Sequence, residues 1–124
     1  MTGEELVLRA EGAAVNAYAP YSNYLVGATI LAKDGDLYDG VNVENAAYPL
    51  GVCAERTAIS KAASEGRRPG DFAAIGITAS PCGGCRQWIF EWGFETVSFR
   101  RGDGSIAEYT PAALLPDTWS FPDR

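Results

Sequence analysis

The sequence predicts an α/β fold in a single domain over residues 1–124, and three observations support this prediction. Helical and extended patterns alternate along the chain in the order α-β-β-α-β-α-β-β-α. The chain has 124 residues, of which 47% are hydrophobic, and this length suits one hydrophobic core. No internal repeat, low-complexity segment or linker divides it. We therefore expect one mixed sheet of about five strands with helices packed on it.

The N-terminal half of the chain predicts a helix, a hairpin and a second helix. Thr2 and Glu5 form the Thr-x-x-Glu pattern of a capping box, ahead of apolar residues at helical spacing. Two extended apolar segments flank the polar sequence KDGD, which predicts a hairpin. Gly66 is a typical stop for the helix that precedes it. The predicted elements are a helix over residues 2–18, strands over 24–32 and 37–43, and a helix over 53–65.

The C-terminal half predicts three further strands and two helices. Gly93 is a typical stop for a helix that begins within residues 81–85. Thr110, followed by a proline, is typical of the start of a short helix. Trp119 and Phe121 place two large aromatic side chains in the tail. The predicted elements are strands over 73–78, 96–100 and 105–109, a helix from 81–85 to 93, a short helix from 110 to 116, and a tail over 117–124.

The balance of charge restricts the partners of the protein. Ten Lys and Arg residues stand against sixteen Asp and Glu residues, which gives a net charge of -6 at pH 7. An acidic protein is poorly suited to a phosphate backbone, so we expect no nucleic-acid partner. The N-terminus has no basic segment leading into an apolar run, and nowhere do about 18 apolar residues follow one another. We therefore expect no membrane partner and a cytoplasmic location.

The sequence contains no histidine. This excludes Ser-His-Asp triads, Cys-His nucleophiles, histidine-ligated zinc and HExxH metalloproteases. We therefore expect any acid or base in this protein to be a carboxylate.

The three cysteines have the spacing of metal ligands. Cys82 and Cys85 lie in the sequence PCGGC at a predicted helix start, which brings both sulfurs to one side of the first turn. Cys53 begins another predicted helix, so two helix N-termini can converge on one ion and favour the thiolate form. The alternative is a redox pair at Cys82 and Cys85 with Cys53 in the core. Pro81 before the pair, together with the third thiol, favours zinc.

Three thiolates leave one position of the zinc ion open to water, because structural zinc usually has four Cys or His ligands. Glu55 follows Cys53 by two residues and is the candidate base beside that water. Its alternatives are a fourth zinc ligand or a first-turn charge. Arg56 is the best placed cation to hydrogen-bond a ligand sulfur and withdraw its negative charge, with Arg86 as a helper. The alternative for Arg56 is an exposed helix arginine.

Two sequence blocks, CAERTA at 53–58 and SPCGGCRQ at 80–87, resemble the small homotetrameric cytidine deaminases. The resemblance implies a three-layer α/β/α fold and a catalytic zinc ion held by Cys53, Cys82 and Cys85. It extends over nearly the whole chain. The other similar blocks are APYS at 19–22, VGA at 26–28, Gly40, NVENAAY at 42–48 and LLP at 114–116.

The reaction that the resemblance implies is hydrolytic deamination, in which zinc activates water for attack at C4 of a pyrimidine nucleoside. Glu55 then takes a proton from the water, delivers it to N3 and protonates the departing amine, so that ammonia leaves. The resemblance assigns Asn42 and Glu44 to the sugar hydroxyls. Without it, these are two polar residues that leave a strand on one face.

The resemblance also implies that the active sites are shared between the subunits of a homotetramer. Tyr48 would extend into a neighbouring subunit's pocket, or else be a core tyrosine. Phe121 from another subunit would flank the base together with Tyr24, and Ala54 would also contact the substrate. The chain departs from the family at Tyr24, where phenylalanine is common, and in a shortened segment before Ser80. Both departures concern the choice of substrate more than the metal.

The sequence therefore predicts a zinc-dependent deaminase of cytidine and deoxycytidine in pyrimidine salvage. One alternative is a deaminase of another aminated heterocycle, such as blasticidin S. A second is a non-catalytic zinc module with Glu55 as the fourth ligand. Nucleic-acid editing is a third, which the acidic charge disfavours.

Overall fold

The structure, a computed structural model, describes residues 1–122 and contains a mixed sheet of five strands. The predicted order of helices and strands is confirmed, and a short 3-10 turn after the second strand was not predicted. The elements are α1 (Gly3–Ala14), β1 (Gly27–Ala32), β2 (Leu37–Val41), η1 (Tyr48–Leu50), α2 (Ala54–Ser64), β3 (Phe72–Ile77), α3 (Gly83–Trp92), β4 (Thr96–Arg100), β5 (Ile106–Tyr109) and α4 (Pro111–Leu114).

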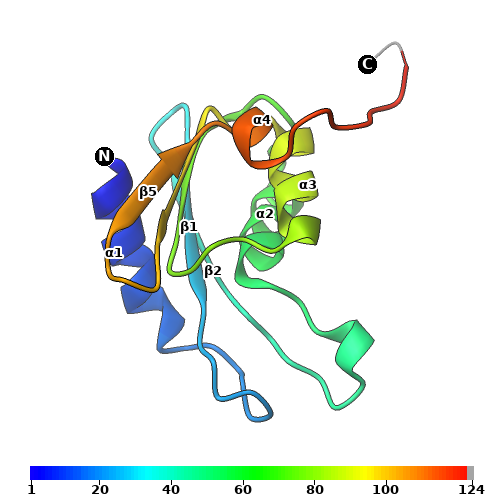
Figure 1. Cartoon of the computed structure of the whole chain (residues 1–124). Coiled ribbons are helices and arrows are strands. Elements are labelled where there is room, and N and C mark those ends of the chain that lie inside the picture. Colours follow the sequence, from blue (N-terminus) through cyan, green and yellow to red (C-terminus); the bar gives the residue numbers. More distant parts are fainter. Residues whose placement is uncertain (123–124) are drawn as a thin grey trace.

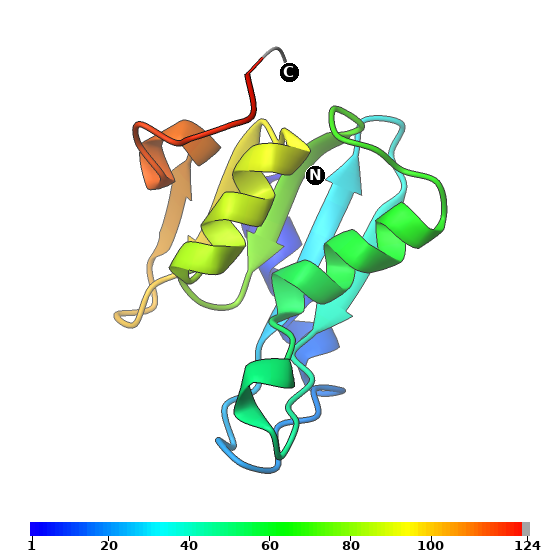
Figure 2. The same cartoon turned by 90° about the vertical axis from the view of Figure 1, so that its right-hand side faces the viewer.

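The sheet has the strand order β2-β1-β3-β4-β5. Only β3 and β4 pair in parallel, joined by the α3 crossover, and the other neighbours are antiparallel. In Figure 1, α1 lies on one side of the sheet while α2 and α3 lie on the other. Figure 2 shows α2 and α3 side by side over the same face. The three-layer α/β/α arrangement is therefore confirmed.

The core lies mainly between the sheet and helices α2 and α3. Gly40 on β2 lets α2 approach the sheet closely. A Cβ atom at this position would lie 2.4 Å from the backbone nitrogen of Ala58 and 2.5 Å from the carbonyl oxygen of Ala54. The first turns of α2 therefore rest directly on β2, and this contact sets the position of the residue that precedes the helix, Cys53.

Helix α1 is shorter than predicted, because it ends at Ala14 rather than near Tyr18. The backbone N–H of Tyr18 donates to the Asn42 carbonyl at 3.0 Å, and its carbonyl accepts from the Glu44 N–H at 2.8 Å. These bonds run to the segment after β2 and compete with helical bonding. The capping box at the start of α1 is confirmed, since Thr2 and Glu5 exchange hydrogen bonds.

The first two strands are also shorter than predicted. Strand β1 starts at Gly27 rather than at Tyr24, because side chains satisfy the backbone before it: Ser22 Oγ accepts from the Tyr24 N–H and Asn42 Oδ1 from the Val26 N–H. Strand β2 ends before Val43, which makes only isolated bridges. The segments around residues 24 and 43 are therefore extended without belonging to the sheet.

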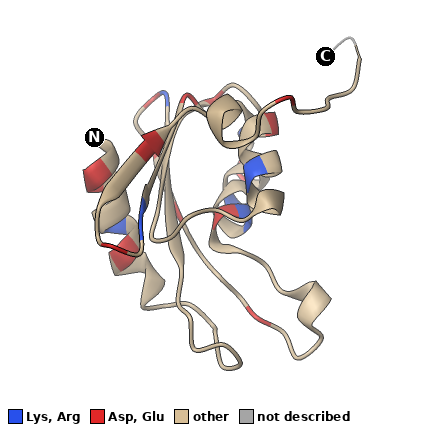
Figure 3. Ribbon diagram, in the orientation of Figure 1, with Lys and Arg blue, Asp and Glu red and all other residues tan. Residues whose placement is uncertain are grey.

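Ion pairs attach α1 to the sheet. Arg9 binds both carboxylate oxygens of Asp39 at 3.0 and 3.1 Å, and Arg100 binds both oxygens of Glu11 at 2.9 Å. In Figure 3, acidic and basic positions are scattered over the ribbon. Within residues 1–122, no helix has the length and hydrophobicity needed to cross a membrane.

Candidate metal and active site

The three cysteines converge at the N-termini of two helices. Cys53 is the N-cap residue of α2, Cys82 is the N-cap residue of α3, and Cys85 lies in the first turn of α3. Their sulfur atoms all lie within 4.8 Å of one another. Helix N-termini favour negative charge, so both helices stabilise thiolates at this point. The predicted convergence of these residues is confirmed.

The environments of the thiols differ. Burial, together with the charges of Glu55 and Cys53, raises the pKa of Cys85. Burial also acts to raise the pKa of Cys82, but hydrogen bonds with Cys85 and Cys53 outweigh it and hold this pKa below its usual value. A divalent cation between the sulfurs would favour the thiolate form of all three. The donor set therefore fits a thiolate-bound metal ion.

Arg56 contacts the metal-binding group directly. Its Nη2 atom donates to Cys53 Sγ at 3.3 Å, and this bond is the main reason that the pKa of Arg56 is raised. Its Nε atom is buried and, among the described residues, has no hydrogen-bond partner. A partly buried guanidinium beside thiolates could offset part of their negative charge. The expected contact with a sulfur is present, and the tuning of charge stays a prediction.

Glu55 is buried beside the same cysteines. Only 4% of this residue is exposed, and burial raises the pKa of its carboxyl group, against the lowering effect of its hydrogen bonds and of Arg56. A carboxyl group with a raised pKa can both take up and release a proton near neutral pH. Glu55 also lines a cavity that Cys53 and Cys82 share. A small molecule in this cavity would meet the Glu55 carboxyl group beside the cysteine sulfurs.

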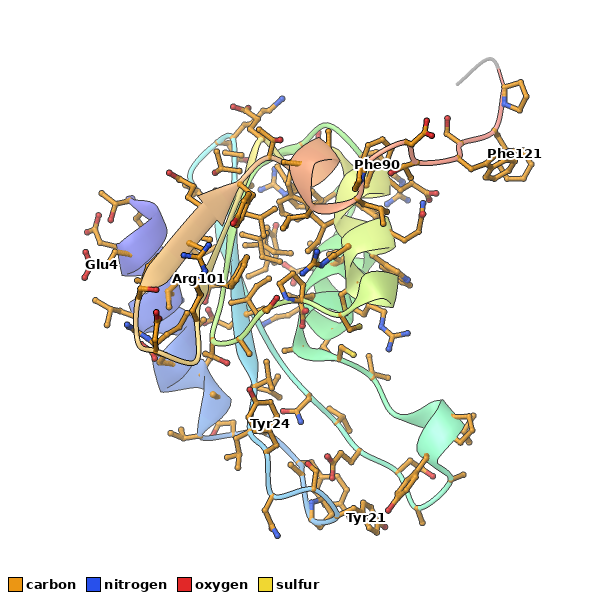
Figure 4. The ribbon with its side chains drawn as sticks, viewed as in Figure 1. Glu4, Tyr21, Tyr24, Phe90, Arg101 and Phe121 are labelled. Carbon is orange, nitrogen blue, oxygen red and sulfur yellow. The ribbon has the colours of Figure 1, made fainter. Side chains whose placement is uncertain are left out.

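The cavity has a volume of about 1000 Å³ and lies beside the last residues of β3, β4 and β5, which are Ile77, Arg100 and Tyr109. Tyr24 and the segment after β2 form one end, and Phe99, Arg101 and Tyr109 form the other. Figure 4 shows Tyr24 and Arg101 apart from each other, with Arg101 beside β5. Seven predicted site residues line the cavity: Tyr24, Asn42, Glu44, Cys53, Ala54, Glu55 and Cys82.

Two predicted site residues lie elsewhere in the chain. Tyr48 is 76% exposed and lines a separate cavity of about 340 Å³ with Tyr21, whose ring it contacts edge-on. Phe121 is 60% exposed on the tail that extends away from the body in Figure 4, with its ring 4.8 Å from that of Trp119. Since the resemblance placed both residues in a neighbouring subunit's site, their roles stay predictions.

Asn42 and Glu44 already have partners within the chain. Asn42 Nδ2 donates to the Tyr24 carbonyl, and Asn42 Oδ1 accepts from the Val26 N–H. Glu44 accepts from the backbone N–H groups of Tyr21 and Ser22, and from the Ser22 hydroxyl group. Both residues therefore hold the loop before β1 as well as facing the cavity.

Several cavity residues were not predicted. Ser22 lies in the family-like sequence APYS at 19–22, but no role was predicted for it. Arg101 and Tyr109 also line the main cavity, and nothing in the local sequence indicates this. Arg86 was expected to help Arg56 at the sulfurs. Its guanidinium instead donates to three oxygen atoms, which are the Pro81 carbonyl, the Leu114 carbonyl and Ser80 Oγ. Arg86 thus connects the cysteine-bearing loop to α4.

Comparison with known proteins decides the family. The model of the family described as "Cytidine and deoxycytidylate deaminase zinc-binding region" matches residues 1–101. The chain belongs to this deaminase family. A curated cytidine deaminase from Sporosarcina psychrophila is 44% identical over 131 aligned positions, which cover 99% of this chain and 95% of the relative.

Solved structures of other deaminases have the same fold. The crystal structure of cytidine deaminase from Burkholderia pseudomallei matches with a TM-score of 0.89 and 42% identity, covering 96% of this chain and 100% of that one. The crystal structure of cytidine deaminase from Mycobacterium tuberculosis matches with a TM-score of 0.82 and 32% identity, covering 98% and 99%. The zinc-binding region of the family and the cluster of Cys53, Cys82 and Cys85 together identify zinc as the metal of this deaminase.

Proposed function

We propose that this chain catalyses the hydrolytic deamination of cytidine and deoxycytidine to uridine and deoxyuridine, with release of ammonia. The observation that carries the proposal is the position of Glu55, which is buried on the cavity wall that also holds Cys53 and Cys82. The names of the relatives support the same reaction. A nucleoside is favoured over a free base by the resemblance and by Asn42 and Glu44, which line the same cavity and can bind sugar hydroxyls.

In this proposal, the three cysteines bind the metal and Glu55 transfers protons. Cys53, Cys82 and Cys85 would hold zinc, which when bound supplies water activated for attack at C4 of the pyrimidine. Glu55 Oε accepts a proton from the attacking water and delivers it to N3 of the base. Glu55 then takes the second proton from the new hydroxyl group at C4 and gives it to the departing amine. The C4–N bond breaks, a carbonyl group forms at C4, and one water molecule is consumed and one ammonia molecule released for each uridine formed. The raised pKa of Glu55 suits a group that must change its protonation state in each cycle.

The remaining cavity residues orient the substrate. Asn42 and Glu44 bind the sugar hydroxyls, Tyr24 flanks the base, and Ala54 at the first turn of α2 contacts the base near the reacting carbon. Arg56 withdraws negative charge from Cys53 through its hydrogen bond to the sulfur. A less negative sulfur donates less charge to the metal, which favours the acidity of the attacking water.

A panel of aminated substrates tests the reaction and its range. We expect ammonia release, with loss of the aminopyrimidine absorbance, from cytidine and deoxycytidine. We expect little from cytosine, because it lacks the sugar that Asn42 and Glu44 contact. The panel also contains cytidine monophosphate and blasticidin S. Turnover of blasticidin S alone would replace the nucleoside proposal, and release from none of the five compounds would favour the non-catalytic zinc module.

We further propose that the protein is a homotetramer with shared active sites. Large hydrophobic side chains, including Tyr48, Leu50 and Trp119, are 76%, 69% and 67% exposed, which is typical of surfaces that are covered in an assembly. Phe121 lies on a tail that projects from the body (Figure 1) and can reach a neighbouring subunit. Sedimentation at working concentration is expected to give four times the chain mass. A monomer with full activity would contradict the sharing of sites.

The proposal also covers the boundaries of the domain and the cellular location of the protein. We include residues 102–124, which lie beyond the matched family region, in a single deaminase domain. The supporting contacts are those of β5 with β4 and of Arg86 with the Leu114 carbonyl. We place the protein in the cytoplasm, where a reducing environment keeps three metal-binding thiols free of disulfides.

A further inference from the structure

Side chains hold much of the loop before β1, in addition to a backbone bond from the Asn42 N–H to the Val26 carbonyl at 3.2 Å. Asn42 satisfies the Tyr24 carbonyl and the Val26 N–H, at 2.9 and 2.8 Å. Glu44 Oε1 accepts the N–H groups of Tyr21 and Ser22 at 3.0 and 3.1 Å. The two residues proposed to bind the sugar therefore also shape the loop that carries Tyr24.

Ser22 connects the Glu44 carboxylate to the backbone of Tyr24. Its hydroxyl group donates to Glu44 Oε2 and accepts the Tyr24 N–H at 3.0 Å. A carboxylate has no proton to give, so the single hydroxyl proton of Ser22 must point to Glu44. Asn23, between the bonded residues, has a φ of 57°, which tightens the turn. The positions of the Glu44 carboxylate and of the Tyr24 backbone are thus linked through one oxygen atom.

The hydrogen bonds also restrict what Glu44 can still accept. A carboxylate has about four acceptor sites. Three are used here, two on Oε1 and one on Oε2. The remaining site is on Oε2, the oxygen atom that Ser22 holds, and Glu44 lines the main cavity together with Ser22. This site can take one further hydrogen-bond donor, such as a single sugar hydroxyl.

We propose that Ser22 is a positioning residue that couples recognition of a sugar hydroxyl by Glu44 to placement of the Tyr24 ring. The proposal rests on the proposed nucleoside function. A substrate hydroxyl on Glu44 Oε2 and the Ser22 hydroxyl share one oxygen atom, so the loop and the sugar hold each other in place. The serine therefore acts on the substrate through Glu44 and Tyr24, without touching the reacting atoms.

The test compares two substrates in two variants and a control. Ser22→Ala is expected to raise KM about tenfold for deoxycytidine while kcat changes less than about twofold. With 2′,3′-dideoxycytidine, which lacks the 2′- and 3′-hydroxyl groups and keeps only the 5′-hydroxyl, the same substitution should change KM by less than about twofold. Ser22→Thr keeps the hydroxyl and should restore KM. Ser64→Ala is the matched control, because the Ser64 hydroxyl group donates to the Ser60 carbonyl within α2.

An equal loss of kcat/KM with both substrates would overturn the proposal, because it would show that Ser22 only supports the fold of the loop. An unchanged KM for deoxycytidine would overturn it as well. Calorimetric titration with deoxyuridine and 2′,3′-dideoxyuridine gives a readout that needs no turnover. If the wild-type protein binds deoxyuridine but releases no ammonia from nucleosides, the proposed function fails. The ratio of Kd values between Ser22→Ala and wild type still decides the role of Ser22.

Discussion

Replacement of Glu55 by glutamine is expected to lower ammonia release from cytidine by at least about 100-fold, which is the usual contribution of a positioned acid–base group. Glutamine has nearly the shape of glutamate but cannot carry the proton from water to N3 or to the departing amine. The zinc content should stay near one ion per chain, because the sulfurs of Cys53, Cys82 and Cys85 are sufficient to hold the metal. Steady-state kinetics and metal analysis on the same sample measure both quantities.

The control for this variant is Glu65→Gln, at the C-cap of the same helix. Its turnover should match that of wild type, because its side chain lies at the opposite end of α2 from the cysteines. The melting temperature of Glu55→Gln should be at least that of wild type, since the substitution removes a buried carboxyl group whose pKa burial raises. Loss of zinc with activity would identify Glu55 as a fourth ligand. Unchanged turnover would remove it from the mechanism.

The metal site could be predicted because it depends on local sequence. Cys82 and Cys85 share the first turn of one helix, and the spacing alone brings their sulfurs together. Placing Cys53 with the other two cysteines required the assumption that the N-termini of two helices meet. This assumption is correct because α2 and α3 cover the same face of the sheet. Arg56 could be predicted for the same reason, because it lies one turn from Cys53 on α2.

The loop before β1 could not be predicted from periodicity. The apolar run from Tyr24 predicts a strand, but the side chains of Asn42 and Ser22 bond to the backbone of Tyr24 and Val26 in place of most of the strand ladder. The predicted end of the first helix was wrong for the same reason, since the backbone of Tyr18 bonds to the segment after β2. The groups that replace the predicted bonds are side chains, or backbone groups far away in the sequence. A hydrophobic pattern records only the spacing of nearby apolar residues, so it gives no signal for such bonds.

The far end of the cavity depends entirely on the order of the strands. Arg101 and Tyr109 come together because β4 and β5 pair antiparallel at the sheet edge, where the tyrosine hydroxyl accepts from Arg101 at 2.8 Å. Neither residue stands in a recognisable motif. The order of the strands is a property of long-range pairing, and the local alternation of patterns does not specify it.

Replacement of Cys85 by serine is expected to remove zinc and activity together. Cys85 is fully buried, and its sulfur lies within 4.8 Å of the sulfurs of Cys53 and Cys82. A hydroxyl group is a much poorer zinc ligand than a soft thiolate, so zinc affinity should fall by more than about 100-fold. Ammonia release should then become undetectable at substoichiometric zinc. Metal analysis after dialysis and assays at increasing added zinc measure the two effects.

Thermal unfolding separates the loss of metal from the loss of packing. A metal that binds only the folded chain raises its stability, so a chelator should lower the melting temperature of wild type and leave Cys85→Ser unchanged. Ala62→Ser, which places a hydroxyl group in the buried part of α2 away from the cysteines, should lose stability but keep its zinc and its response to the chelator. Zinc retained in Cys85→Ser would remove this residue from the ligand set. A native chain in which Cys82 and Cys85 form a disulfide would support the redox alternative, because zinc requires both sulfurs as thiolates.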